Sequence, residues 1–438
     1  MRAFNRLALI SLLAIGFLAS AALADEPAGF DNGIKPGTII TMQNWDQYKQ
    51  FMPPGMVALF QGTYFWKMPP DVEMPVGPTL LRPLPKDYVE ATEKYGSQTQ
   101  VTHYPDGSMG LSNFVTGQPF PNPQEPDKGY KILADLWYPP VPHLLVLPSA
   151  TPASFCTVDR FGSSACTKTS VVYRQLAFNW EPGVPRTEKA GGGAYYSEWL
   201  MVEQPEQSRY TADLTLLWQD LTKDQDDYVF VPALRRSLRL STAARCAPLF
   251  GSDMTHDDQR GGYNGGLNIF NAVAAPDMKM LAITDLTNAD GAFPAEYDMP
   301  LGWAKPSWGP WSVRDVYVIN VKRIPSQRAG YCYGNRTMYV DKQLFHQLWL
   351  ELYDSNNKLW KIVSVHLHPQ EWPGYGVQGL NGSLIEQYWD LQNEHVSHVF
   401  TADSDGKRNG LIYDSEVPAE YDNIMKYSTP GGLMQIMR

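Results

Sequence analysis

Residues 347–368 read QLWLELYDSNNKLWKIVSVHLH and carry the clearest structural signal in this 438-residue chain. Leucines at alternate positions from Leu348 to Leu352 show the two-residue period of a β-strand. Residues 354–357 (Asp-Ser-Asn-Asn) predict a tight turn, because Asn and Asp tolerate the positive φ angles that such turns require. A second apolar run, residues 360–368, follows this turn, so the stretch predicts an antiparallel β-hairpin.

Other segments with strand character extend this pattern along the chain. Further strands are expected over residues 195–202, 214–219, 228–231, 315–322, 337–341, 385–391 and 395–401. They follow one another without regular helices between them, which favours an antiparallel meander over a doubly wound parallel sheet. Several carry large apolar side chains on both faces, so one face must pack against a second layer, a helix or a ligand. The sequence therefore predicts a mainly β (α+β) fold.

The N-terminal third differs in composition, being rich in proline, glycine and aromatic residues. Short helices are expected there at residues 44–51, 56–60, 88–95 and 131–138. The many aromatic side chains argue against disorder, so this part is interpreted as an ordered region that wraps the sheet. The expected divisions are a cleaved signal peptide (residues 1–24), a Pro-rich wrapping region (25–153) and an antiparallel half-barrel (154–438). The last two form one continuous unit.

The first 24 residues have the three parts of a secretory signal peptide. Arg2 and Arg6 form a basic region, residues 7–18 are almost wholly apolar, and Ala22-Leu23-Ala24 offers a cleavage site before Asp25. The apolar run is too short to span about 30 Å of hydrocarbon as a helix, so a membrane anchor is the weaker alternative. The sequence therefore predicts export to the periplasm, with no membrane span in the mature chain.

The chain is acidic, with 36 basic and 46 acidic side chains. Removal of the signal peptide, which has two arginines and no carboxylate, changes the formal net charge from −10 to −12. Such a protein lacks the excess of Lys and Arg that neutralises phosphates. Nucleic acid and anionic lipid surfaces are therefore disfavoured as partners.

Four cysteines, Cys156, Cys166, Cys246 and Cys332, allow three pairings if all are oxidised. A local bond between Cys156 and Cys166 would close a short loop and contribute about 3 kcal/mol in the chain-entropy model. The remaining two would then join distant strands. Because the spacing fits no zinc template and export favours oxidation, we expect structural disulfides rather than metal-binding or catalytic thiols.

Two patterns could suggest a metal or phosphate site. His366 and His368 lie two residues apart on one predicted strand and share a face, but a third metal ligand is not evident. A solvated or hydrogen-bonded pair is the preferred interpretation. Residues 191–193 are all glycine but lack the lysine and the strand-to-helix context of a phosphate loop. We therefore expect no metal and no other cofactor.

A third pattern, Thr255-His256-Asp257-Asp258, could suggest acid–base chemistry, but no nucleophile elbow accompanies it. Asp257 and Asp258 are more simply explained as caps of a helix or turn, or as partners of Arg235 or Arg236. No catalytic residue is assigned. A hydrolase stays as the third hypothesis, because a pair of catalytic carboxylates needs proximity in space and not in sequence.

The apolar faces of the predicted strands are the more promising feature. Any one of these residues could belong to an ordinary core, yet a curved sheet too open to fill itself would leave some of them lining a cavity. A long acyl chain buried there would contribute roughly 10 kcal/mol before association costs, at about 0.8 kcal/mol per methylene. The candidate lining residues are Tyr195, Trp199, Met201, Leu214, Leu216, Trp218, Tyr228, Phe230, Tyr317, Ile319, Leu348 and Leu350.

Several segments resemble a family of exported bacterial proteins, domain-of-unknown-function family 1329, whose members are often labelled outer-membrane lipoprotein-sorting-like. Residues 117–121 (GQPFP) are similar to its Gly-x-Pro-Phe-Pro segment. Residues 228–236 (YVFVPALRR) and 251–258 (GSDMTHDD) resemble its central block. Residues 339–341 (YVD) and 351–360 resemble its C-terminal hairpins. The likeness extends over nearly the whole mature chain.

The resemblance implies a fold akin to the lipoprotein carriers LolA and LolB, in which an incomplete antiparallel β-barrel curls around a few helices and leaves an apolar cavity. It also implies binding of lipids or acylated proteins without chemistry. We therefore predict a non-catalytic periplasmic carrier or chaperone for a hydrophobic ligand, such as a lipid or an acylated protein. Its partners would be an inner-membrane transporter or an outer-membrane protein. A structural or adaptor protein of an envelope complex is the second hypothesis.

Overall fold

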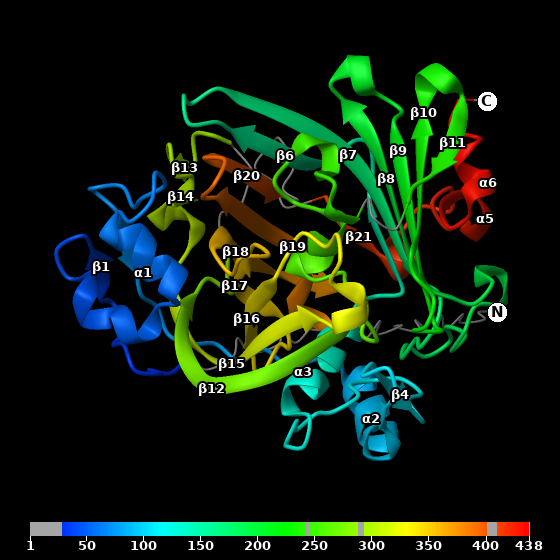
Figure 1. Cartoon of the computed structure of the whole chain (residues 1–438), viewed down its shortest axis with the longest axis horizontal. Coiled ribbons are helices and arrows are strands. Elements are labelled where there is room, and N and C mark those ends of the chain that lie inside the picture. The colour runs from blue at the N-terminus through cyan, green and yellow to red at the C-terminus, as the bar shows by residue number, and fades with distance from the viewer. Residues whose placement is uncertain (1–28, 242–244, 288–292, 401–409, 438) are drawn as a thin grey trace, which may run out of the picture.

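The computed structural model describes residues 29–241, 245–287, 293–400 and 410–437. The predicted signal peptide, residues 1–24, lies outside the described residues. The described chain forms one large antiparallel sheet, three two-stranded sheets and a few short helices (Figure 1). The prediction of a mainly β fold on an antiparallel sheet is therefore confirmed.

The large sheet has 15 strands, and its main path runs β11-β10-β9-β8-β7-β6-β20-β19-β18-β17-β16-β15-β12. Their bounds are β6 (Ala153–Val158), β7 (Ser164–Gln175), β8 (Ala194–Gln204), β9 (Ala212–Trp218), β10 (Asp226–Val231), β11 (Arg236–Arg239), β12 (Phe270–Ala282), β15 (Ser312–Arg323), β16 (Asn335–Asp341), β17 (Gln347–Tyr353), β18 (Leu359–Trp372), β19 (Gly376–Asp390) and β20 (His395–Phe400). Beside this path, β5 (Leu144–Leu147) pairs with both β7 and β21 (Ile412–Tyr413). In the described part of the chain β11 and β12 have no pairing with each other, so the sheet curls without closing.

The sheet consists of two meanders joined along one seam. One meander runs from β6 out to β11, and the other runs from β20 back to β15 and on to β12. At the seam β20 pairs antiparallel with β6, from Val396 opposite Val158 to Phe400 opposite Ser154. Strands that are about 240 residues apart in the chain thus lie side by side.

The hairpin predicted from residues 347–368 is confirmed as β17 and β18. Leu350 lies opposite Val363 and Leu352 lies opposite Lys361. At the turn, Asn357 has a φ of 61°, the left-handed conformation that Asn tolerates. The remaining predicted strands correspond to β8, β9, β10, β15, β16, β19 and β20, with bounds that differ by a few residues, except that β19 begins nine residues earlier.

Short helices from the N-terminal third pack against the sheet. They are a 3-10 helix (Trp45–Phe51), α1 (Pro54–Gln61), α2 (Lys86–Tyr95) and α3 (Lys128–Trp137), as the sequence predicts with small shifts. The minor sheets of this region pair β1 (Ile39–Thr41) with β2 (Glu73–Pro75) and β3 (Gln100–His103) with β4 (Met109–Ser112). A third joins β13 (Tyr297–Asp298) to β14 (Trp303–Ala304).

Close contacts fix two of these helices on the sheet. An ideal Cβ at Gly129 of α3 would lie 2.4 Å from the carbonyl oxygen of Ala272 on β12, so only glycine permits this approach. The backbone amide of Gly55 in α1 donates a hydrogen bond of 2.6 Å to Glu351 Oε1 on β17. This contact satisfies one of the free amides at the start of the helix.

The C-terminal helices cover a different part of the sheet. In Figure 1 α5 (Ile424–Tyr427) and α6 (Pro430–Leu433) lie at the right, beside β8 to β11. Tyr427 of α5 and Leu433 of α6 are buried there in what we call the outer cluster, and the Tyr427 ring lies edge-on to Trp199, with centroids 5.0 Å apart. The outer cluster also contains Leu144, Val146, Val172, Ala212, Leu214, Leu216 and Phe230, with Met201, Trp218 and Tyr228 packed against it.

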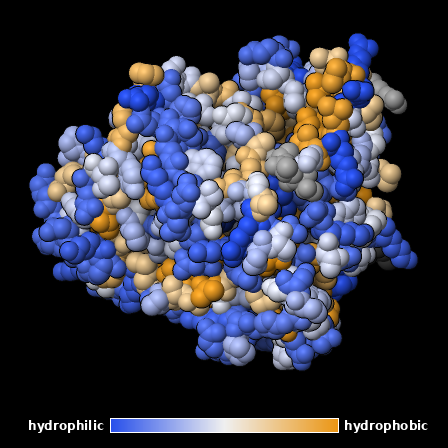
Figure 2. Space-filling model, in the orientation of Figure 1, coloured by the Kyte–Doolittle hydropathy of each residue, from blue (hydrophilic) through white to orange (hydrophobic). Residues whose placement is uncertain are grey.

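The four cysteines form two disulfides, Cys156–Cys166 and Cys246–Cys332. The first joins β6 to β7 at positions that lie opposite each other in the sheet. Within the described ranges, none of the helices has the length and apolar character needed to cross a membrane. The face shown in Figure 2 is largely hydrophilic, with apolar side chains gathered near the edge strand β11.

Candidate functional site

An apolar cavity of about 170 Å³ lies between the sheet and the end of α3. Side chains from β5 to β8 and from β20 form its walls, together with residues 254–260 and 345–347. Its apolar lining consists of Leu136, Pro139, Val141, Leu145, Leu147, Ala153, Phe155, Val171, Tyr173, Leu200, Met254, Phe345, Val399 and Leu411. A cavity of about 150 Å³ suffices for benzene, whereas ligand pockets usually measure 300–1,000 Å³. The space therefore fits a short apolar group and not a whole long chain.

Polar side chains reach the same cavity. They are Glu198, Gln259, Arg260, His346, Gln347 and Glu386. The cavity thus combines an aliphatic wall with several groups that can be charged or form hydrogen bonds. This combination is typical of sites that hold an apolar ligand and fix its orientation through a few polar contacts.

Arg260, in α4 (Gln259–Gly262), is the principal cation of the cavity. Its guanidinium carbon lies 4.4 Å from the ring centroid of Tyr196 and 5.2 Å from that of Trp137, distances typical of cation–π contacts. Within the described residues it forms no ion pair, and its Nη1 atom is buried without a hydrogen-bond partner. Its backbone has a φ of 60°, which non-glycine residues adopt rarely and often at functional sites.

Two further groups at the cavity have shifted pKa values. Burial raises the pKa of Glu198 to about 7, against the opposing effect of Arg260. Burial also lowers the pKa of His346 to about 4, and the His346 Nδ1 atom lies 2.8 Å from the carbonyl oxygen of Gln347. At neutral pH His346 is therefore neutral and Glu198 is partly protonated, and Arg260 is the one lysine or arginine among the lining residues.

Two larger clefts open on the surface. One, of about 850 Å³, lies between α2 and α3, and the other, of about 720 Å³, lies beside residues 104–114 and 219–222. Neither is lined by an arginine, whereas the smaller cavity has in its wall a half-buried arginine that forms no ion pair within the described residues. The cavity at Arg260 is therefore the stronger candidate site.

The sequence matches the profile of a family described as Protein of unknown function (DUF1329) over residues 39–430. This chain belongs to the DUF1329 family. It is 22% identical over 391 residues to an uncharacterized protein of Pseudomonas aeruginosa, which covers 86% of this chain and 78% of that protein. The resemblance found in the sequence is therefore confirmed.

Two crystal structures are similar to this DUF1329 chain. One is a DUF1329 family protein from Desulfovibrio piger, with 15% identity, a TM-score of 0.45, and coverage of 69% of this chain and 100% of that one. The other is a LolA superfamily protein from Nitrosomonas europaea, with 12% identity, a TM-score of 0.34, and coverage of 63% and 88%.

None of the twelve residues proposed from the sequence of this DUF1329 chain lines the cavity at Arg260. Seven of them belong to the outer cluster or pack against it: Trp199, Met201, Leu214, Leu216, Trp218, Tyr228 and Phe230. On β8 the cavity is lined instead by Glu198 and Leu200, which alternate with Trp199 and Met201. Because successive side chains on a strand point to opposite faces, Trp199 and Met201 lie on the face that α5 and α6 cover.

The other five proposed residues, Tyr195, Tyr317, Ile319, Leu348 and Leu350, belong to the main core or pack against it. Tyr195 is four residues before Trp199, so regular alternation would place both side chains on the same face of β8. Tyr195 instead lies in the main core, because the pairing of β8 with β9 shifts by one residue between Ala194 and Tyr196. Its hydroxyl donates a hydrogen bond of 2.9 Å to the carbonyl oxygen of Trp137.

The segment Thr255-His256-Asp257-Asp258 caps a turn, as expected, but its predicted arginine partners are wrong. Thr255 and Asp258 form a reciprocal capping box. Asp257 is fully buried and pairs with Arg245, Arg323 and Arg336, and Asp258 pairs with Arg336. Arg235, which precedes β11, and Arg236, the first residue of β11, are exposed instead.

His366 and His368, which were considered as a possible metal-binding pair, each form hydrogen bonds with other residues. His366 Nε2 lies 3.1 Å from Ser364 Oγ and 3.2 Å from Gln387 Oε1, and burial lowers the pKa of His366 to about 4. His368 Nδ1 lies 2.6 Å from Gln370 Nε2.

Sequence reasoning missed Arg260 and Glu198. Glu198 carried a usable signal, because it is the one charged residue in the segment 194–202 of β8. Arg260 carried none, since an arginine beside three glycine or glutamine residues resembles an ordinary loop.

Proposed function

We propose that this DUF1329 protein binds an amphipathic molecule, placing an apolar segment of it in the cavity and an anionic group against Arg260, and that it acts on this ligand as a carrier without chemistry. One observation carries the proposal: an arginine without a carboxylate partner among the described residues lies in the wall of an apolar cavity. Arg260 is half-buried, and a guanidinium withdrawn from water costs free energy unless an anion pairs with it. A bound carboxylate or phosphate would supply that anion.

The size of the cavity limits how much of the ligand it can enclose. About six carbons fit a space of this size, and at about 0.8 kcal/mol per methylene they contribute roughly 5 kcal/mol. Association costs at least about 4 kcal/mol, so the apolar segment alone would bind weakly. A charge-assisted contact with Arg260 adds about 1.5–3 kcal/mol and makes binding measurable.

Export to the periplasm is the setting that we propose for this carrier. Two disulfides persist in oxidising compartments and are rare in the cytosol. The inner-membrane transporter or outer-membrane protein expected from the sequence would then deliver or receive the ligand.

Isothermal titration of the purified protein with sodium butanoate, pentanoate, hexanoate, octanoate and decanoate tests the proposal. We expect the affinity to rise about fourfold per added methylene and to level off once the cavity is full. Octanol, which lacks the carboxylate, should bind about tenfold more weakly than octanoate.

Two neighbouring positions on β8 provide matched variants. Leu200→Phe fills the cavity and should lower octanoate affinity at least tenfold, whereas Met201→Phe adds a similar ring on the opposite face and should leave the affinity unchanged. Equal effects of the two variants, or no saturable binding by the folded wild-type protein, would refute the proposal. A tight protein partner with no bound lipid in native mass spectrometry would favour the adaptor hypothesis. Hydrolysis of p-nitrophenyl octanoate that Glu386→Gln abolishes would favour a hydrolase.

A further inference from the structure

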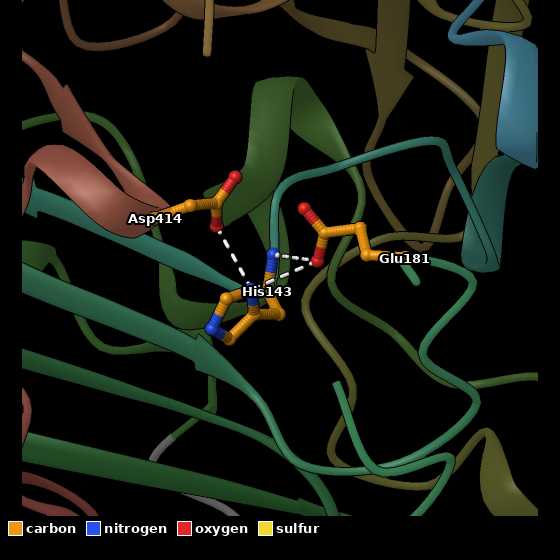
Figure 3. Close-up of side chains that lie close together, drawn as sticks. All are labelled: His143, Glu181 and Asp414. Atoms are coloured by element: carbon orange, nitrogen blue, oxygen red, sulfur yellow. Dashed lines mark hydrogen bonds and ion pairs between the residues drawn. The ribbon is translucent and has the colours of Figure 1, made fainter. Parts of the chain in front are cut away.

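Three potential metal ligands from distant segments meet beside β5. His143 immediately precedes β5, Glu181 lies in the loop after β7, and Asp414 immediately follows β21. The sheet brings them together, because β5 pairs with both β7 and β21. Figure 3 shows both carboxylates directed toward the same ring nitrogen of His143.

The distances place three donor atoms around one point. His143 Nδ1 lies 2.8 Å from Glu181 Oε2 and 2.9 Å from Asp414 Oδ1, and all three ligand atoms lie within 4.8 Å of one another. Adjacent ligands of an octahedral ion, each about 2.1 Å from the metal, are about 3 Å apart. The observed separations are close to that value, so small movements would admit an ion.

Backbone amides hold both carboxylates in place. The amide of His143 donates a hydrogen bond of 3.0 Å to Glu181 Oε2, and the amide of Leu144 donates one of 3.2 Å to Asp414 Oδ1. Such contacts from outside the ligand set orient ligand atoms before a metal arrives.

The charges also favour a cation. Two carboxylates face one imidazole, and in the described ranges neither forms an ion pair with lysine or arginine. The side chains are only 22%, 7% and 14% exposed for His143, Glu181 and Asp414, so water screens this excess negative charge poorly. The His143 ring can donate its Nδ1 proton to only one of the two carboxylates.

We propose that His143, Glu181 and Asp414 bind a divalent transition-metal ion of the Mn²⁺ or Zn²⁺ class, with water in the remaining coordination positions. Imidazole and carboxylate together suit such ions. Ca²⁺ prefers sites made entirely of oxygen ligands and should bind poorly here. The site is separate from the cavity at Arg260, and its occupation does not depend on the proposed carrier function.

A proton is the competing occupant. Although burial opposes the charged form, hydrogen bonds with Asp414 and Glu181 raise the pKa of His143 to about 9. The metal must therefore displace this proton, as at other histidine-containing sites.

The test is equilibrium dialysis of the chelator-treated full-length protein against Zn²⁺, Mn²⁺ and Ca²⁺, with bound metal measured by mass spectrometry. We expect one equivalent of Zn²⁺ or Mn²⁺ and no saturable Ca²⁺. His143→Gln and Asp414→Asn should each weaken binding at least tenfold. His103→Gln is the matched control, because His103 faces a single carboxylate, Asp127, at 2.9 Å on the surface, and it should not change binding.

A second measurement needs no variant. A crystal of the wild-type protein soaked in Zn²⁺ and measured at the zinc absorption edge locates the bound ion. It should show one anomalous peak within about 2.3 Å of His143 Nδ1 and none beside His103. Absence of saturable Zn²⁺ and Mn²⁺ binding by the wild-type protein would overturn the proposal, and so would one equivalent bound at another place. In either case the three residues would be a self-contained ion cluster.

Discussion

Glu198 gives the protein a pH-dependent stability that one substitution should remove. This carboxyl lies on β8 at the cavity wall, and its Oε2 atom is buried without a hydrogen-bond partner in the described structure. Burial raises its pKa from 4.5 to about 7; Arg260 opposes this shift and Asp227 adds to it. The folded protein therefore keeps this proton over a pH range in which the unfolded chain has released it.

The sign and size of the effect follow from proton linkage. Between pH 4.5 and 7 the folded state binds more protons than the unfolded state, so the free energy of unfolding falls as the pH rises. A shift from 4.5 to about 7 corresponds to about 3 kcal/mol, lost between about pH 4 and pH 8. Glu198→Gln is neutral at every pH and should not show this loss.

The measurement is urea-induced unfolding followed by tryptophan fluorescence at pH 5, 6, 7 and 8. We expect the difference in free energy of unfolding between Glu198→Gln and wild type to shift by roughly 2–3 kcal/mol in favour of the variant as the pH rises from 5 to 8. Glu206→Gln, at a side chain that is 81% exposed, is the control and should follow the wild-type pH dependence. A difference between Glu198→Gln and wild type that stays constant from pH 5 to pH 8 would refute the reasoning.

Three further predictions concern stability and can be measured by the same urea unfolding. Asp257→Asn removes the charge that three arginines share and should cost about 3–5 kcal/mol, because Arg245 and Arg323 then have no carboxylate partner among the described residues and only Arg336 keeps one, Asp258. Gly129→Ala forces a methyl group against the carbonyl of Ala272 and should cost about 1–3 kcal/mol; an unchanged midpoint would show that α3 can move away freely. Replacing Cys246 and Cys332 by alanine opens a loop of 86 residues and should cost about 4.6 kcal/mol in the chain-entropy model, while a loss below about 1 kcal/mol would contradict it.

Strand positions could be predicted wherever alternation and turn residues coincide. The hairpin of β17 and β18 is the best example, since its period-two leucines and its Asn357 turn are both local features. The same reasoning failed for β12, an edge strand that contains Pro276 at a break in its register. Proline is tolerated at such edges and bulges, but in a sequence it argues against a strand.

The choice of face could not be made from the sequence. Strand β8 carries apolar residues on both sides, and the pattern alone does not show which side meets α5 and α6 and which side meets the cavity. A covering element located more than 200 residues later in the chain decides it. For that reason Trp199 was predicted at the cavity, whereas Leu200 lies there.

The sequence by itself determined the elements, the antiparallel class, the cysteines available for disulfides and the family resemblance, because each depends on local period, turn chemistry or ordered motifs. Only the tertiary structure decided which residues meet. Arg260 and Glu198 reach one cavity from separate elements, and Glu181 in the loop after β7 and Asp414 next to β21 both reach His143. The physical reason is that the pairing of β5, β7 and β21 and the curl of the sheet bring these groups together. Neither the pairing nor the curl can be predicted from the spacing of residues along the chain.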